Sequence, residues 1–342
     1  MPLERFFLAV VVLTLIATLI VGGLALLAQL ARESRGAEIT LLTGILVLSL
    51  LIGGAGVFTG LGLVLMASGG EISSGDRLAF VGAGVAAILV GIVGVALCVA
   101  PLRRIMGLRL KREFWADPPI FFALWLLVVV LANNAVSFLI FTQEPDVTQL
   151  FPSGRISPTA VLTSQLPFLA VALAGVGLGV RRGFREAMNR LGYGPITLKQ
   201  LGIVVVFVAV AFGLSVAADA LFGVVQPDLH KTVGDLSDSL FNPKGLGPVA
   251  AILFSLMIGV GAALGEETLF RGAVQPVLGI PITSILFASM HIQYGPSLLL
   301  GYVFLLSIGL GLLRKHINTT ASFTAHAGYN TLGLLLTYFF SG

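Results

Sequence analysis

The sequence predicts an all-α fold, a polytopic bundle of transmembrane helices. Of its 342 residues, 57% are hydrophobic and only 11% are charged, whereas a soluble domain carries about 25% charged residues. The mean hydropathy is +1.02. Apolar runs of about 20 residues, the length that crosses a bilayer as a helix, follow one another along the chain. Together these features indicate a multi-pass membrane protein.

Nine or ten membrane segments are expected. The first seven are predicted at residues 6–30, 40–67, 78–102, 120–142, 159–180, 200–225 and 248–265. The first of these is too long for a typical signal-peptide core and is expected to be a retained span. The last part of the chain is less regular, with a short run at 278–291, a break at "IQYGPS", and further runs at 297–313 and 319–340.

Charge in the predicted loops indicates how the chain is oriented in the membrane, and the net charge and cysteine count limit the kinds of ligand expected. Lysines and arginines gather in loops 103–119 and 181–199, whereas 143–158 and 226–247 carry more acidic residues. Basic loops face the cytoplasm, which puts the end of the 248–265 segment near that side. The net charge of +4 is small and gives no indication of nucleic-acid binding. The single cysteine, Cys98, excludes an intramolecular disulfide and argues against a cysteine-rich metal site.

The stretch "GAALGEETLFRGAV" places charges beside an apolar run. A charged residue at membrane depth costs about 2.5–3.5 kcal/mol on insertion scales, so such residues indicate function. Glu267 and Arg271 are spaced i and i+4, the favourable order for a helical ion pair. Glu266 is turned about 100° away and is expected to face another surface, such as a water-filled cavity.

Two later stretches carry histidines. In "HAGYN", His326 and Asn330 project from one face of the last helix; in "FASMH", Phe287 precedes His291 by one turn and is expected to pack against its ring. A carboxylate and an imidazole can activate a water, and a second imidazole with an amide can stabilise an oxyanion. This set suffices to hydrolyse an amide without a covalent intermediate or a cofactor. The alternative is a zinc site on Glu266, His291 and His326, although the motif H-E-x-x-H is absent.

The three motifs E-E-x-x-x-R, F-x-x-x-H and H-x-x-x-N occur here in this order, as "EETLFR", "FASMH" and "HAGYN". This arrangement resembles the CPBP family of type II CAAX prenyl endopeptidases and bacteriocin-processing or Abi proteins. The resemblance covers about residues 245–340, within a predicted protease core at 201–342. Residues 1–200 are predicted to form additional spans, to which we assign no role.

The resemblance implies an intramembrane endopeptidase of the cell (cytoplasmic) membrane whose site opens towards the cytosol. Glu266 would be the catalytic base, helped by His291, and His326 with Asn330 would form the oxyanion hole. Glu267 and Arg271 would hold the site in shape. The substrate would be a membrane-embedded or lipidated peptide or protein in the lipid bilayer. For these groups to meet, the helix of Glu266 must continue past Arg271 towards Pro276, so that the boundary at 265 would be misplaced.

Other interpretations remain open from the sequence. Each motif alone fits a structural role: an ion pair at a helix end, a helix-end histidine, or a polar contact between helices. The intramembrane amides Asn133, Asn134 and Gln165 are expected to bridge helices. A proton-coupled transporter would also use buried carboxylates, histidines and a broken segment. A non-catalytic membrane scaffold of the same family is the third possibility.

Overall fold

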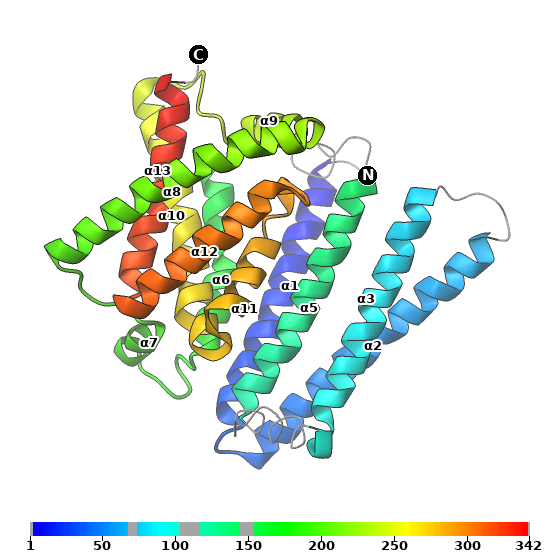
Figure 1. Ribbon diagram of the computed structural model, residues 1–342. Coiled ribbons are helices and arrows are strands. Elements are labelled where there is room, and N and C mark those ends of the chain that lie inside the picture. The colour runs from blue at the N-terminus through cyan, green and yellow to red at the C-terminus, as the bar shows by residue number, and fades with distance from the viewer. Residues whose placement is uncertain (1–2, 68–73, 103–116, 144–153, 341–342) are drawn as a thin grey trace. The chain divides into compact units, whose positions relative to one another are not determined.

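The computed structural model describes residues 3–67, 74–102, 117–143 and 154–340, and the regular elements within them are helices (Figure 1). Their bounds are α1 Leu3–Leu30, α2 Arg35–Ala67, α3 Ser74–Cys98, α5 Pro118–Gln143, α6 Pro158–Gly175, α7 Phe184–Leu191, α8 Leu198–Val225, α9 Pro227–Phe241, α10 Pro248–Glu266, η3 Glu267–Val274, α11 Gln275–Ser289, η4 Ile292–Tyr294, α12 Leu298–His316 and α13 Thr319–Phe340. The predicted all-α class is confirmed.

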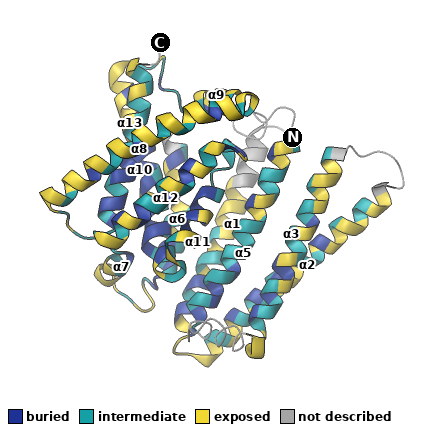
Figure 2. Cartoon of the chain, viewed as in Figure 1, coloured by how far each residue is buried: buried dark blue, intermediate teal, exposed yellow. Residues whose placement is uncertain are grey.

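Length and composition support several membrane crossings. Within the described residues, seven helical stretches are long and apolar enough to cross a membrane. They lie in α1, α2, α3, α5, α8, the stretch Pro248–Ser289, and α12. The apolar helix α6 is shorter. The outward faces are apolar as well: Leu198 and Val224 on α8 are 87% and 81% exposed, and Figure 2 shows α8 exposed along much of its length. The chain is therefore a multi-pass membrane protein.

The chain divides into two compact units. The first contains Met1–Gly23, Thr148–Ala288 and Ser297–Gly342, and the second contains Leu24–Val147 and Ser289–Pro296. The first unit therefore holds Glu266, Glu267, Arg271, His326 and Asn330, together with Phe287.

The second unit contains the paired helices α2 and α3 and the helix α5. At the α2–α3 contact, a Cβ added at Gly91 would lie 2.9 Å from the Cα of Gly53. The two backbones are therefore closer than larger side chains at these positions would permit. Buried Asn134 of α5 donates a hydrogen bond to Ser289 Oγ over 3.0 Å. This contact confirms that Asn134 joins two helices. Asn133 donates to Asn134 Oδ1 over 3.3 Å.

In the first unit, α10 lies against α6 and α13, and α8 lies against α12 and α13. Val161, Phe254 and Ile258 form one buried cluster between α6 and α10. Small residues permit the close approach of α10 to α13, because a Cβ added at Gly259 would lie 2.9 Å from the carbonyl oxygen of Ala327. This contact brings the end of α10 beside the middle of α13.

The predicted boundary at residue 265 is wrong. Helical structure continues from Pro248 past Arg271 as far as the non-helical residue Gly279, and a second helical part follows to Ser289, which agrees with the separate segment predicted at 278–291. The run bends at Gly279, where φ is 79° and ψ is 170°. Glycine adopts this conformation at little cost, and Pro281 follows it in the sequence. The helix of Glu266 thus continues past Arg271 towards Pro276, as expected from the sequence for the site residues to meet.

Two helices lie where loops were predicted. The interval 181–199 contains α7, and the interval 226–247 contains α9. Helix α9 is amphipathic and buries Val233, Leu236 and Leu240, an i, i+3, i+7 pattern that its acidic residues obscured. Most of the basic loop 103–119, at 103–116, and the acidic residues Glu144 and Asp146 lie outside the described residues.

Candidate active site

The candidate site is built on a change of helix type. Helix α10 ends at Glu266, and η3, the next eight residues, is a π-helix. Such wider turns within α-helices occur frequently at functional sites. The π segment is buried: Glu267 and Arg271 have no exposed surface, and Thr268 and Phe270 are 3% and 2% exposed.

Glu267 and Arg271 form the ion pair that their spacing predicts. Arg271 Nε lies 3.3 Å from Glu267 Oε2, and both side chains are fully buried. Arg271 also donates from Nη2 to the hydroxyl of Ser307 on α12 over 2.9 Å. Its guanidinium lies 5.0 Å from the centre of the Phe287 ring, within the range of a cation–π contact. Ser307 was not predicted, because a single hydroxyl in an apolar helix has no distinctive sequence pattern.

His326 of α13 lies between the two glutamates. Its Nδ1 is 3.0 Å from Glu267 Oε1, at hydrogen-bond distance, and its Nε2 is 3.9 Å from Glu266 Oε2. The carboxylate of Glu267 therefore contacts Arg271 with one oxygen and His326 with the other. Because a carboxylate accepts hydrogen bonds, Glu267 favours a proton on Nδ1 of His326, and Nε2 is then directed towards Glu266.

Glu266 has a different environment from its neighbour. Its side chain is 16% exposed, whereas that of Glu267 is fully buried. The Oε2 atoms of both glutamates are buried and have no hydrogen-bond partner among the described residues, but that of Glu267 lies 3.3 Å from Arg271 Nε in the ion pair, whereas that of Glu266 lies 3.9 Å from His326 Nε2. Glu266 is thus the carboxylate of the pair with an oxygen available for a water or a substrate.

The walls of the site are aromatic and hydroxylic. Phe287 packs edge-on against His326, with ring centres 5.9 Å apart, and against Phe270 at 5.2 Å. Tyr193, between α7 and α8, shares a hydrogen bond of 2.5 Å with Thr268 Oγ1. Burial raises the pKa of the Tyr193 phenol, the hydrogen bond to Thr268 opposes this rise, and the charge of Glu267 adds to it. Tyr193 and Thr268 were not predicted as neighbours of the site.

Gln165 of α6 packs against the backbone beside Glu266. A Cβ added at Gly265 would lie 2.3 Å from Gln165 Oε1, and Gln165 is 8% exposed. Its Oε1 has no hydrogen-bond partner among the described residues. The predicted interhelical position of Gln165 is therefore confirmed, with α6 and α10 meeting at Gly265.

Asn330 and His291 complete the set of predicted residues. Asn330 lies one turn after His326 on α13, is half-buried, and makes no side-chain hydrogen bond within the described ranges. His291 belongs to the second unit, where it precedes η4 and its ring stacks on Tyr294 with centres 5.9 Å apart. The predicted approach of His291 to Glu266, and the packing of Phe287 on His291, stay predictions.

Metal binding was the alternative use of these residues. Across the described part of the chain, no group of three or more His, Cys, Asp and Glu side chains is arranged to hold a metal ion. Both nitrogens of His326 face carboxylates, and Nδ1 is engaged by Glu267. A zinc ion bound by Glu266 and His326 would therefore use Nε2 of His326. It would also require a third protein ligand, the role that the metal alternative gives to His291.

Comparison with known families supports the sequence motifs. Residues 248–332 match the family described as type II CAAX prenyl endopeptidase Rce1-like. The matched segment runs from α10 into α13 and contains each predicted site residue. This match confirms the resemblance to the CPBP family over that segment. No curated protein and no solved structure matches the chain.

Proposed function

We propose that the protein is an intramembrane endopeptidase that cleaves a membrane-associated or lipidated substrate. The observation that carries the proposal is the division between the two adjacent glutamates. Glu267 has both oxygens in contact with buried partners, at 3.3 Å from Arg271 Nε and 3.0 Å from His326 Nδ1. Glu266 is 16% exposed, and its Oε2 forms no ion pair with Arg271 and lies 3.9 Å from His326 Nε2. One carboxylate is thus structural and its neighbour is available for chemistry.

The proposed reaction is hydrolysis by an activated water. Glu266 takes a proton from the water as its oxygen attacks the scissile carbonyl carbon. The developing oxyanion accepts hydrogen bonds from His326 Nε2, with His326 carrying a proton on each ring nitrogen, and from the amide of Asn330. Glu266 then returns the proton to the leaving amine as the carbon–nitrogen bond breaks. His291 is proposed to orient the water.

The rest of the cluster positions these groups. Glu267 fixes the ring of His326 through Nδ1, and Arg271 holds Glu267 while being anchored to Ser307 on α12. Three helical elements are thereby joined by one polar chain. We place the site towards the cytoplasmic side because α12 ends in the basic residues Arg314, Lys315 and His316.

The proposal is tested by cleavage of fluorogenic peptides, lipidated and unlipidated, by the purified protein in liposomes. Glu266→Gln is expected to reduce kcat by at least about 10²-fold, the usual contribution of a general base. Asp235→Asn, which removes an exposed carboxylate of α9, serves as the matched control and is expected to leave kcat unchanged. Full activity of Glu266→Gln would refute the assigned base.

Two further arms address the alternatives. Loss of cleavage on chelation, with recovery on adding zinc, would move Glu266, His291 and His326 into a metal site. If neither the wild type nor the variants cleave any peptide, a complementation assay of the protein's cellular role distinguishes a protease from a transporter or scaffold. A Glu266→Gln variant that fully supports that role would favour the transporter or scaffold.

A further inference from the structure

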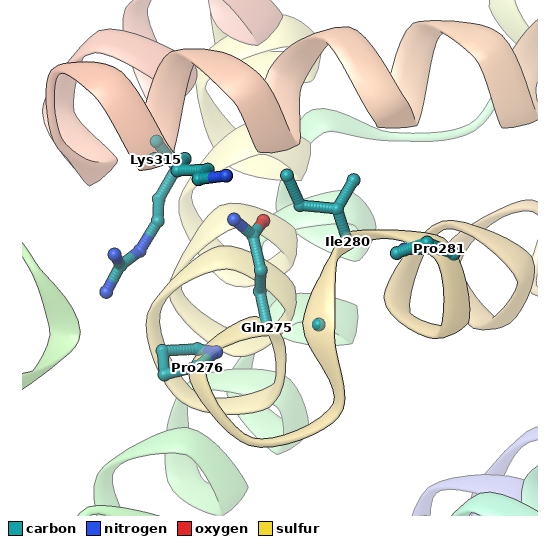
Figure 3. Close-up of a pocket in the computed structure, with 7 residues that line it drawn as sticks. Gln275, Pro276, Ile280, Pro281 and Lys315 are labelled. Atoms are coloured by element: carbon teal, nitrogen blue, oxygen red, sulfur yellow. The ribbon is translucent and has the colours of Figure 1, made fainter.

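A cavity of about 370 Å³ lies outside the candidate active site, at the bend of the long helical run (Figure 3). Its lining comes from α11 and from the last turn of α12: Gln275, Pro276, Gly279, Ile280, Pro281, Arg314 and Lys315. The bend at Gly279 interrupts the helix, and the two proline rings and Ile280 give the cavity an apolar wall. Cavities of this size accommodate small ligands and parts of larger ones.

The charged side of the cavity is cationic. Arg314 and Lys315 are its ionisable residues, no acidic side chain is among the lining residues, and neither cation forms an ion pair with a described residue. Arg314 donates from Nε to the backbone oxygen of Arg271 over 3.1 Å, so its terminal nitrogens remain for another acceptor. The cavity therefore attracts an anion.

Gln275 places a second requirement on a ligand of this cavity. It is 7% exposed, and its Nε2 donates to the carbonyl oxygen of Gly311 over 2.9 Å. Its Oε1 is buried with no hydrogen-bond partner among the described residues. Figure 3 shows the carboxamide reaching towards the helix of Lys315, with its oxygen on the side of Ile280. A ligand that satisfies this atom must carry a hydrogen-bond donor.

We infer that this cavity binds the headgroup of an anionic phospholipid that carries a hydroxyl or ammonium group, of which phosphatidylglycerol is the simplest. The phosphate would lie at Arg314 and Lys315, the donor at Gln275 Oε1, and the glycerol end against Ile280 and the prolines. The position fits, because the basic last turn of a membrane-spanning helix lies at the lipid headgroups. Basic pockets between membrane helices bind such headgroups.

The position also connects the lipid to the candidate active site. Gln275 follows η3 directly, and Arg314 holds the backbone oxygen of Arg271. A bound headgroup would therefore fix the end of the helical run that carries the two glutamates. The inference concerns binding and does not depend on the proposed proteolysis.

Binding is measured by native mass spectrometry of the full-length protein in a neutral detergent, titrated with phosphatidylglycerol or phosphatidylcholine. Wild type is expected to retain phosphatidylglycerol in preference to phosphatidylcholine. Lys315→Gln removes one cation from the cavity and is expected to weaken phosphatidylglycerol binding about fivefold, the share of one basic residue near the headgroups. Lys199→Gln removes an exposed lysine of α8 and is expected to bind as wild type does.

Lys315 is exposed, so its substitution is expected to leave the thermal midpoint unchanged, which verifies the fold. Equal phosphatidylglycerol binding by Lys315→Gln and wild type would overturn the site. So would equal retention of the two lipids by wild type. Soluble glycerol 3-phosphate distinguishes the source of the anion: if it displaces phosphatidylglycerol at equal concentration, the site binds a free phosphate ester and the lipid assignment is wrong.

Discussion

Removing Arg271 should destabilise the protein strongly, because it leaves a buried carboxylate without its cation. Arg271 and Glu267 have no exposed surface and lie 3.3 Å apart. Breaking a buried pair by removing one partner costs about 3–5 kcal/mol. For a chain of this size, about 2 °C of thermal midpoint corresponds to 1 kcal/mol. Arg271→Met is therefore expected to lower the midpoint by about 6–10 °C in detergent.

The double variant distinguishes a specific pair from two separate contacts. Glu267→Gln alone leaves the guanidinium buried and should also destabilise. Glu267→Gln combined with Arg271→Met removes both charges and is expected to recover most of the lost stability, since an apolar replacement of a buried pair is often neutral. Thermal unfolding of the four proteins gives the coupling energy.

Cleavage by the same four proteins separates stability from positioning. The double variant lacks the carboxylate that holds His326 Nδ1, so it is expected to stay folded and remain impaired in turnover. An additive loss of midpoint in the double variant would refute the coupling of Glu267 with Arg271. Recovery of full activity would refute the positioning role of Glu267.

Three other predictions follow from the described contacts. Asn330→Ala should lower kcat by about 10²-fold with little change in thermal midpoint, as loss of one oxyanion donor does; an unchanged kcat would remove Asn330 from the mechanism. Gly259→Ala should destabilise by about 1–3 kcal/mol, because its Cβ would meet α13 backbone at 2.8 Å. Gly202→Ala, with open space around it, is the neutral or stabilising control. Burial raises the pKa of Tyr193, so the unfolded phenol ionises first, and stability should fall as pH rises above about 10. This decline should be shallower in Tyr193→Phe when thermal midpoints are compared across pH.

The sequence predicted the membrane class and the local pairs because both depend on short-range patterns. Long apolar runs indicate helices whatever their neighbours, and the spacing of Glu267 and Arg271 brings their side chains together on any helix. The contact of Gln165 with α10 was expected only as a bridge between helices. These predictions needed no knowledge of how the chain folds over itself.

Other features depend on contacts that spacing alone does not encode. Ser307 and Tyr193 are 36 and 75 residues from their partners at the site, and nothing near them in the sequence marks the contact. The α-to-π transition at Glu267 was missed because the sequence "GEETLFRG" is also compatible with an ordinary helix. By contrast, the break at Gly279 agrees with the separate segment predicted from residue 278, since glycine and proline both weaken a helical pattern.

The arrangement of the two glutamates follows from the shape of an imidazole. Consecutive helical residues point about 100° apart, which predicted separate surfaces for Glu266 and Glu267. Their exposures do differ, at 16% and 0%. Both nevertheless approach His326, because its two ring nitrogens lie on opposite edges and each meets one carboxylate. A histidine on a facing helix can therefore connect a structural carboxylate to a reactive one that directly precedes it in sequence. In this arrangement Arg271 pairs with Glu267, Glu267 holds the ring of His326, and Glu266 is the more exposed carboxylate, to which the proposed mechanism assigns the water.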